Sequence, residues 1–120
     1  MLFEIYLPTA IYDPVHEELL SSMIYEFGGV TVTQGKGYWR DSAGDLIAEE
    51  VSVYSSYASA LEHSRSGLRC FGEDLADRLL EVTEEETILY TIDGSRSLVN
   101  RAGKGEDRPD GMYKDISGLL

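Results

Sequence analysis

The stretch TVTQGKGYWRDSAGDLIAEEVSVY, residues 31–54, decides the fold of this chain. Residues 30–38 and 46–57 are rich in β-branched and aromatic side chains, and the Asp-Ser-Ala-Gly-Asp segment between them is typical of a turn. The sequence therefore predicts a β-hairpin. Gly35 and Gly37 lie inside its first strand, which is typical of a bulge or a close backbone approach, and they leave the register open by one residue.

The segment before the hairpin predicts a strand followed by a helix. Residues 2–7 alternate in hydropathy. Asp13-Pro14 is a strong helix start, because Asp can cap the first turn and Pro suits the first helical position. An apolar stripe then recurs at Val15, Leu19, Met23 and Phe27, and Gly28-Gly29 supplies the stop. This stripe must pack on a sheet.

The segment after the hairpin predicts a second helix, from about Leu68 to Val82, and a last strand from Thr87 to Asp93 that ends at Gly94. The element order is then β-α-β-β-α-β. It predicts an α+β, ferredoxin-like two-layer sandwich, with two helices on one face of a four-stranded antiparallel sheet. The other face is left open, so it must be polar, bind something or pair with a second copy.

The predicted domain covers residues 1–94. Residues 95–120 are rich in Gly, Ser and charge without a sustained period, and we expect them to form a flexible or partner-docked tail.

The charge of the chain is strongly negative, with a formal net charge of -12. Residues 1–94 hold eighteen acidic and five basic side chains. Such a body repels phosphate backbones, which argues against direct nucleic-acid binding through a basic patch. Three explanations of the acidity stay open: solubility, a high-salt host (the chain has three Lys and seven Arg), and an inhibitor that covers a basic surface.

The sequence predicts a cytoplasmic protein without a membrane segment. Its first residues carry Glu4 where a secretory signal would place Lys or Arg, and no apolar run reaches the roughly 18 residues that span a bilayer. The single cysteine, Cys70, is interpreted as a structural thiol. No metal-ligand spacing or phosphate-binding glycine loop is present in the sequence, so no cofactor is predicted.

The hairpin also carries a family-level pattern. Gly37-Tyr38-Trp39-Arg40-Asp41, followed by Gly44, Glu50 and Ser52, resembles the motif G-x-W-R-D-x-x-G-x-x-x-x-x-E-x-S of a bacterial domain-of-unknown-function family. Gly29 and Thr31-Val32 are similar to the family's G-x-T-V approach to that motif. The resemblance covers about a third of the chain. It implies a small ferredoxin-like domain and brings no assigned reaction.

The hairpin holds the candidate catalytic residues Glu49, Glu50 and Arg40. Glu49 and Glu50 are successive strand residues, so they point to opposite faces of the sheet. A carboxyl group in an apolar setting would suit general acid or base chemistry. The alternative is that one pairs across the hairpin with Arg40 or Lys36 and the other is solvated. Trp39 either anchors a ligand or partner or caps the core.

The open face is the predicted binding surface. Glu4 and Tyr6 lie opposite the core residues of the first strand, and Glu50, Ser52 and Tyr54 share their face if Val51 and Val53 point inward. Together with Trp39, these aromatic and polar groups would fit a homodimer, a protein partner or a small polar ligand.

The leading functional prediction is therefore a non-catalytic binding or interaction domain that acts through its open sheet face. A second hypothesis is an acidic inhibitor of the immunity or anti-defence type, acting through Glu73, Asp74, Asp77 and Glu81 on the second helix. A third is a small enzyme with Glu49 or Glu50 as its base, Arg40 as an anion clamp and Trp39 as a substrate wall. The sequence shows no catalytic signature that names a reaction.

Overall fold

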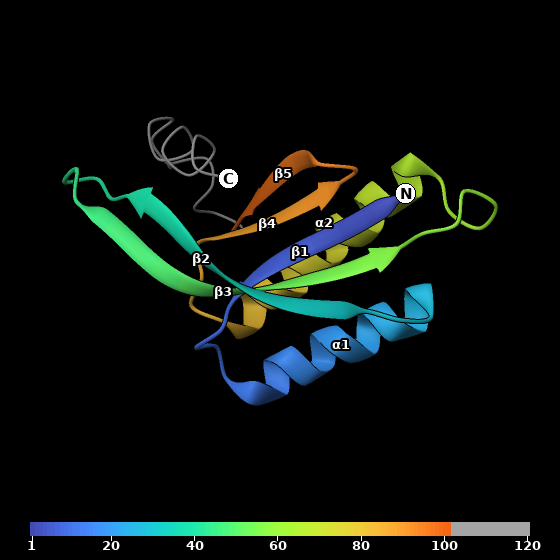
Figure 1. Cartoon of the computed structure of the whole chain (residues 1–120), viewed down its shortest axis with the longest axis horizontal. Helices are drawn as coiled ribbons and strands as arrows, with labels where there is room; N and C mark the ends of the chain where they lie inside the picture. The colour runs from blue at the N-terminus through green and yellow to red at the C-terminus, as the bar shows by residue number, and fades with distance from the viewer. Residues whose placement is uncertain (102–120) are drawn as a thin grey trace.

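A computed structural model describes residues 1–101, which form one five-stranded antiparallel sheet and two helices (Figure 1). The elements in chain order are β1 (Leu2–Pro8), α1 (Asp13–Phe27), β2 (Thr31–Arg40), β3 (Leu46–Tyr57), α2 (Arg65–Val82), β4 (Thr87–Ile92) and β5 (Ser95–Asn100). The strand order is β2-β3-β1-β4-β5. The first six elements confirm the predicted ferredoxin-like order, with β5 added beside β4.

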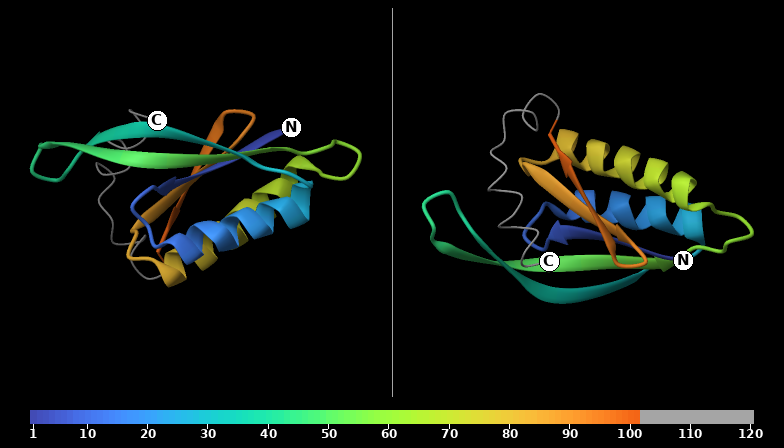
Figure 2. Two further views of the ribbon diagram at one scale, coloured as in Figure 1. Left: turned by 60° about the horizontal axis from the view of Figure 1, so that its bottom comes forward. Right: turned by 90° about the horizontal axis from the view of Figure 1, so that it is seen from above.

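The two helices lie together on one face of the sheet, and no helix of residues 1–101 covers the other face (Figure 2). The core lies between these layers. Phe3, Ile5 and Leu7 of β1 are fully buried there against Leu19 and Met23 of α1. This burial confirms the predicted strand and helix stripes, because alternate residues of a strand and every fourth residue of a helix share one face.

The helix boundaries follow from the local sequence with two small differences. Pro14 lies in the first turn of α1, but Tyr12 occupies the N-cap position and makes no side-chain cap bond, so Asp13 is already helical. Gly28 ends the helix in the left-handed region, with a φ of 85°. α2 begins at Arg65, three residues earlier than predicted, because the Ser64 side chain accepts a hydrogen bond from the Gly67 amide.

α2 packs tightly on the sheet through a glycine. A Cβ atom added at Gly72 would lie 2.6 Å from the ring of Tyr90, which is fully buried on β4. The missing side chain lets the helix approach this aromatic ring. The Tyr90 hydroxyl then donates a hydrogen bond of 2.8 Å to Glu73, at the edge of the same contact.

The domain extends beyond the predicted boundary at residue 94. Residues 95–100 were assigned to the tail, whereas the structure places them in β5, paired with β4 along its whole length. Asp93 and Gly94 form the two-residue connection, and both have positive φ angles, 50° and 81°. This is the backbone shape of tight hairpin turns. The rest of the predicted tail, residues 102–120, lies outside the described residues.

The β2–β3 hairpin is longer than the sheet that supports it. β2 pairs with β3 without a bulge from Thr31 to Arg40, whereas β1 pairs with β3 only from Val51 to Tyr57. Residues 36–40 and 46–50 therefore form a two-stranded arm beyond β1, with the turn between them at its tip. Figure 1 shows this arm extending past the helices.

Candidate ligand-binding site

The open sheet face carries a pocket at the base of this arm. Its cavity volume is about 360 Å³, a size that suits a small-molecule ligand. The lining residues come from all five strands and from the loop between α2 and β4: Tyr6, Leu7, Pro8, Gly37, Tyr38, Trp39, Glu49, Val51, Glu84, Glu85, Glu86, Thr87, Leu89 and Leu98. One wall is thus the arm, and the opposite wall is the α2–β4 loop with β4 and β5.

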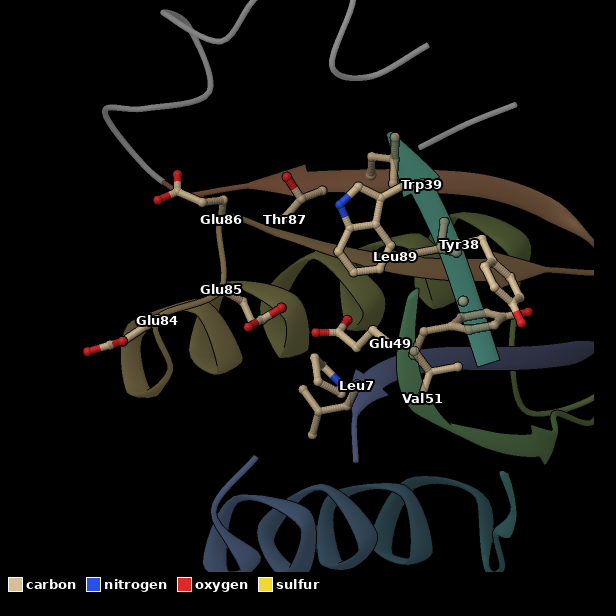
Figure 3. A pocket seen from close by; sticks show the side chains of 14 residues that line it. Leu7, Tyr38, Trp39, Glu49, Val51, Glu84, Glu85, Glu86, Thr87 and Leu89 are labelled. Carbon is tan, nitrogen blue, oxygen red and sulfur yellow. The ribbon is translucent and has the colours of Figure 1, made fainter. Parts of the chain in front are cut away.

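Strand pairing explains which side chains reach this pocket. Gly37 is the pairing partner of Glu49, and Leu89 is the partner of Leu98, so each pair shares a sheet face. Trp39 lies two residues beyond Gly37 and therefore points to the same side. Figure 3 shows the Trp39 indole above the cavity, with Leu89 behind it. These side chains give the pocket an aromatic and aliphatic wall.

Two carboxylates face each other in the pocket. Figure 3 shows the Glu49 and Glu85 side chains pointing toward one another below the indole of Trp39. Burial raises the pKa of Glu49. Burial also raises the pKa of Glu85, and the negative charge of Glu49 raises it further. Removal from water and a neighbouring like charge both disfavour the ionised form, so this pair resists carrying two negative charges.

Arg101 holds the loop that carries Glu85. It follows β5, and its guanidinium donates hydrogen bonds to the carbonyls of Leu80, Thr83 and Glu85. Its own amide donates to the Glu86 carbonyl at 3.1 Å. These contacts satisfy carbonyls near the end of α2 and fix the loop against the sheet. The positive charge of Arg101 also lowers the pKa of Glu85, against the two larger effects that raise it.

Four predicted site residues lie on the open face. Trp39, Glu49 and Tyr6 line the pocket. Burial, and then the charge of Glu4, raise the pKa of the Tyr6 hydroxyl. Glu4 itself accepts hydrogen bonds from Ser55 (2.8 Å) and Thr91 (3.5 Å) on the flanking strands. Its carboxylate is therefore held within the sheet surface.

Tyr54 and Glu50 were predicted on the open face, and the structure corrects both placements. Tyr54 pairs with Ile5, whose side chain is in the core, so Tyr54 points to the helix side and is only 2% exposed. Its hydroxyl bonds to Nδ1 of His16 on α1. Glu50 has the same strand parity and lies on the same side, where it pairs with Lys36 across the hairpin at 3.5 Å.

Arg40 and the acidic helix residues lie outside the pocket. The Arg40 guanidinium donates a 3.0 Å hydrogen bond to the Gly44 carbonyl at the tip of the arm, so it does not join Trp39 and Glu49 as an anion clamp. The acidic residues of α2 are exposed on the helical layer: Glu73, Asp74, Asp77 and Glu81. The third functional hypothesis therefore keeps Glu49 and Trp39 but loses Arg40 and Glu50.

Leu98 was not predicted as part of a site, and Glu84–Glu86 were not predicted to line a pocket on the open face. The signal for the loop was the run of three glutamates directly after a helix. Nothing in the sequence places that run beside Glu49, which lies 36 positions before Glu85.

No group of three or more His, Cys, Asp or Glu side chains within residues 1–101 is arranged to hold a metal ion. Neither of the two helices in this part of the chain is long and apolar enough to cross a membrane.

The fold and the pocket together define a small ferredoxin-like domain with a ligand-sized cavity on its open sheet face. The sequence matches no protein-family model and no curated protein. In structure the chain is similar to a phage SAM lyase in complex with S-methyl-5′-thioadenosine, with a TM-score of 0.63 and 11% identity over 85% of this chain and 90% of that one. The apo state of a phage SAM lyase gives a TM-score of 0.61 at 12% identity, over 84% and 89%. At this identity the likeness is one of fold.

Proposed function

We propose that this chain binds a small, positively charged ligand with a flat apolar part in the pocket on its open sheet face. The observation that carries the proposal is the combination of Trp39 with the facing carboxylates of Glu49 and Glu85 in one cavity. An indole face attracts cations through its π electrons and also stacks on flat apolar groups. A carboxylate pair favours a positive charge between its members.

S-adenosylmethionine is the first ligand to test. Its sulfonium carries a positive charge, which the carboxylates of Glu49 and Glu85 would attract. Its adenine is a flat ring, which can stack on the indole of Trp39. The structurally similar phage enzyme is a SAM lyase and holds S-methyl-5′-thioadenosine. That enzyme supports the choice of probe, while the pocket chemistry supports the class of ligand.

Trp39 makes the test direct, because it is the sole tryptophan of the chain and lines the pocket. We expect S-adenosylmethionine to change the Trp39 fluorescence saturably. S-adenosylhomocysteine, which lacks the sulfonium charge, should bind more weakly by about tenfold or more, since one charge-assisted contact is worth roughly 1.5–3 kcal/mol. Calorimetry gives an independent affinity for both ligands.

The matched variants are Glu49→Gln and Glu50→Gln. These residues are neighbours in β3, but only Glu49 faces the pocket, whereas Glu50 pairs with Lys36 on the other side. Glu49→Gln should weaken S-adenosylmethionine binding by about tenfold, and Glu50→Gln should leave it unchanged. If neither ligand binds, by fluorescence or calorimetry, the proposal is wrong.

A second candidate is a lyase acting on the same ligand. The specific observation that favours it is the raised pKa of Glu49, which suits a carboxylate that accepts a proton. In such an elimination Glu49 would take a proton from the carbon next to the one bonded to sulfur, and the electrons of that C–H bond would form a carbon–carbon double bond. The sulfonium's bond to the amino-acid side chain would break with its electrons going to sulfur, which leaves S-methyl-5′-thioadenosine and an unsaturated amino acid. Chromatography of S-adenosylmethionine incubated with the protein would detect that thioether. Binding of S-adenosylmethionine without turnover would contradict the lyase activity and support the binding function.

Self-association through the open face and inhibition of a basic partner stay predictions. A homodimer formed through this face would cover the pocket, so light scattering with and without S-adenosylmethionine separates the two uses of the surface. Inhibition would instead depend on Glu73, Asp74, Asp77 and Glu81, and charge reversal there should leave the pocket's ligand affinity unchanged.

A further inference from the structure

We propose that Glu49 and Glu85 hold one proton between them in the empty pocket and release it when the cationic ligand binds. This inference rests on the proposed function, because it concerns how the same site is regulated. It makes the ligand's affinity depend on pH in a direction and size that can be measured.

The first step is the geometry of the two carboxylates. Glu49 comes from β3 on the arm, and Glu85 comes from the loop after α2. Figure 3 shows the two side chains converging in the cavity below Trp39. Both backbones belong to anchored elements, because β3 is paired with β2 at Glu49 and Arg101 bonds to the loop at the Glu85 carbonyl.

The second step is the set of charged and titratable groups around the pair. The loop adds Glu84 and Glu86, β1 adds Tyr6, and β2 adds Tyr38. None of these four side chains carries a basic group. Within residues 1–101, the charge of Arg101 lowers the pKa of Glu85, and its guanidinium is directed to three backbone carbonyls. Besides burial, the charges of Glu49 and Glu86 both raise the pKa of Glu85, so a proton on the pair reduces the repulsion between these carboxylates.

The third step is the exchange itself. Two interacting carboxylates lose their protons in two separate steps, and the pKa of each step belongs to the pair rather than to one residue. The pKa of the second step is raised, because that step places two negative charges side by side. A ligand cation placed between them provides the positive charge that the shared proton provided. Binding then converts a singly charged pair with its proton into a doubly charged pair with its cation, and the proton leaves to solvent.

The sign of the pH effect follows from linkage. Where the empty pair holds its proton, the ligand must displace it, so affinity is lower at acid pH and rises with pH by up to about tenfold per unit. The rise stops once the empty pair is fully ionised. A neutral ligand of the same shape gains nothing from the exchange, so its affinity should stay flat or fall over the same range.

Calorimetry of the full chain with S-adenosylmethionine tests this directly. At one pH near the midpoint of the affinity rise, the binding heat is measured in two buffers of different ionisation enthalpy, and the difference counts the protons released. We expect a fraction of a proton up to one per ligand, and an affinity that rises with pH above the ordinary carboxyl value of 4.5 until the empty pair is ionised.

The variants are Glu85→Gln and Glu50→Gln. Glu85→Gln leaves Glu49 without its like-charged neighbour, so proton release and the rise of affinity with pH should both be smaller than in the wild type, because only burial still raises the pKa of Glu49. Glu50→Gln, on the other side of β3, should keep both at wild-type values. Binding with no proton release and a flat profile in the wild type overturns the inference while the proposed function stands. Absence of binding at every pH overturns the proposed function as well.

Discussion

Gly37 keeps the pocket open, because it has no side chain on the face of the arm that lines the cavity. It lies on the open face opposite Glu49, and a Cβ atom added there would lie 3.5 Å from Cγ1 of Val51, which is an ordinary contact. The strand could therefore carry a side chain at this position without strain. That side chain would project into the cavity, so the absence of one keeps the pocket open.

Gly37→Val is expected to abolish ligand binding without harming the fold. Valine suits a strand better than glycine, so the free energy of unfolding should be unchanged or higher by about 0.5–1 kcal/mol. The matched control is Gly35→Val. Gly35 lies on the same face as Gly37, and a Cβ atom added there would lie 3.9 Å from Cγ2 of Val51, but Gly35 does not line the pocket. Fluorescence titration and chemical denaturation measure both effects, and wild-type affinity in Gly37→Val would contradict the assigned cavity.

The elements show which parts of the fold the sequence could predict. Both helices and the first four strands were predicted because their signals are local: Asp13-Pro14 begins α1, and its apolar residues recur every four positions. β5 was missed although Asp93-Gly94 is a strong hairpin signal, because residues 95–100 contain only Leu98 and Val99 as apolar residues.

The sequence left the register of β3 open, and the predicted binding surface used the face that the structure does not have, for a physical reason. Val51 and Val53 are the apolar residues of its central part, so a hydrophobic pattern turns them inward. The structure instead buries Ser52, Tyr54 and Ser56. Each of these has a polar partner distant in sequence, for example the Gly29 carbonyl for Ser56 at 2.6 Å. Burial of a polar group is tolerated when it is hydrogen-bonded, and such partners cannot be seen in a local pattern.

The candidate site was predictable only in part. Tyr6, Trp39 and Glu49 were singled out as individual residues. Their meeting with Glu85 depends on the pairing of β1 with both β3 and β4, which brings segments far apart in the chain onto one surface. No single-sequence pattern reports such a contact.

The β4–β5 turn depends on a glycine with a positive φ angle. Gly94 has a φ of 81°, a region where a Cβ atom costs about 1–2 kcal/mol. Gly94→Ala should lower the free energy of unfolding by about that amount, measured by denaturant titration. Gly29→Ala is the control, because its added Cβ also meets nothing within 4 Å but its φ is not positive. Equal effects of the two changes would show that the turn conformation is not the cause.

At the scale of the whole molecule, the excess of negative charge makes stability depend on pH. The net charge is -12. The pKa values of Glu49 and Glu85 are raised in the folded state, chiefly by burial. A raised pKa means that the folded state binds the proton more tightly than the unfolded chain. The resulting stability is present below the unfolded value of 4.5 and is lost as pH rises through the folded pKa. Asp93 acts in the opposite direction, because the hydrogen bond from the Leu2 amide lowers its pKa.

The ligand-free protein should therefore lose stability as pH rises from about 4.5 toward neutrality. The double variant Glu49→Gln/Glu85→Gln should lose less and be more stable than wild type at neutral pH, because the like-charged pair is gone. Thermal or chemical unfolding across the pH range measures this, with Glu50→Gln as the control. Parallel curves for wild type and double variant would show that the pair does not contribute to the pH dependence.

The turn at the tip of the arm is held by hydrogen bonds among its own residues, 41–45. The Asp41 carboxylate accepts hydrogen bonds from the amides of Ala43 and Asp45, both 2.9 Å, and the Asp41 amide donates to the Asp45 carbonyl. None of these contacts involves the helices or the core. The tip is thus a module that can be lengthened, shortened or exchanged while the rest of the chain folds as before. Variation in arm length could reshape the cavity for different ligands on a constant scaffold, and the same position suits the insertion of a reporter.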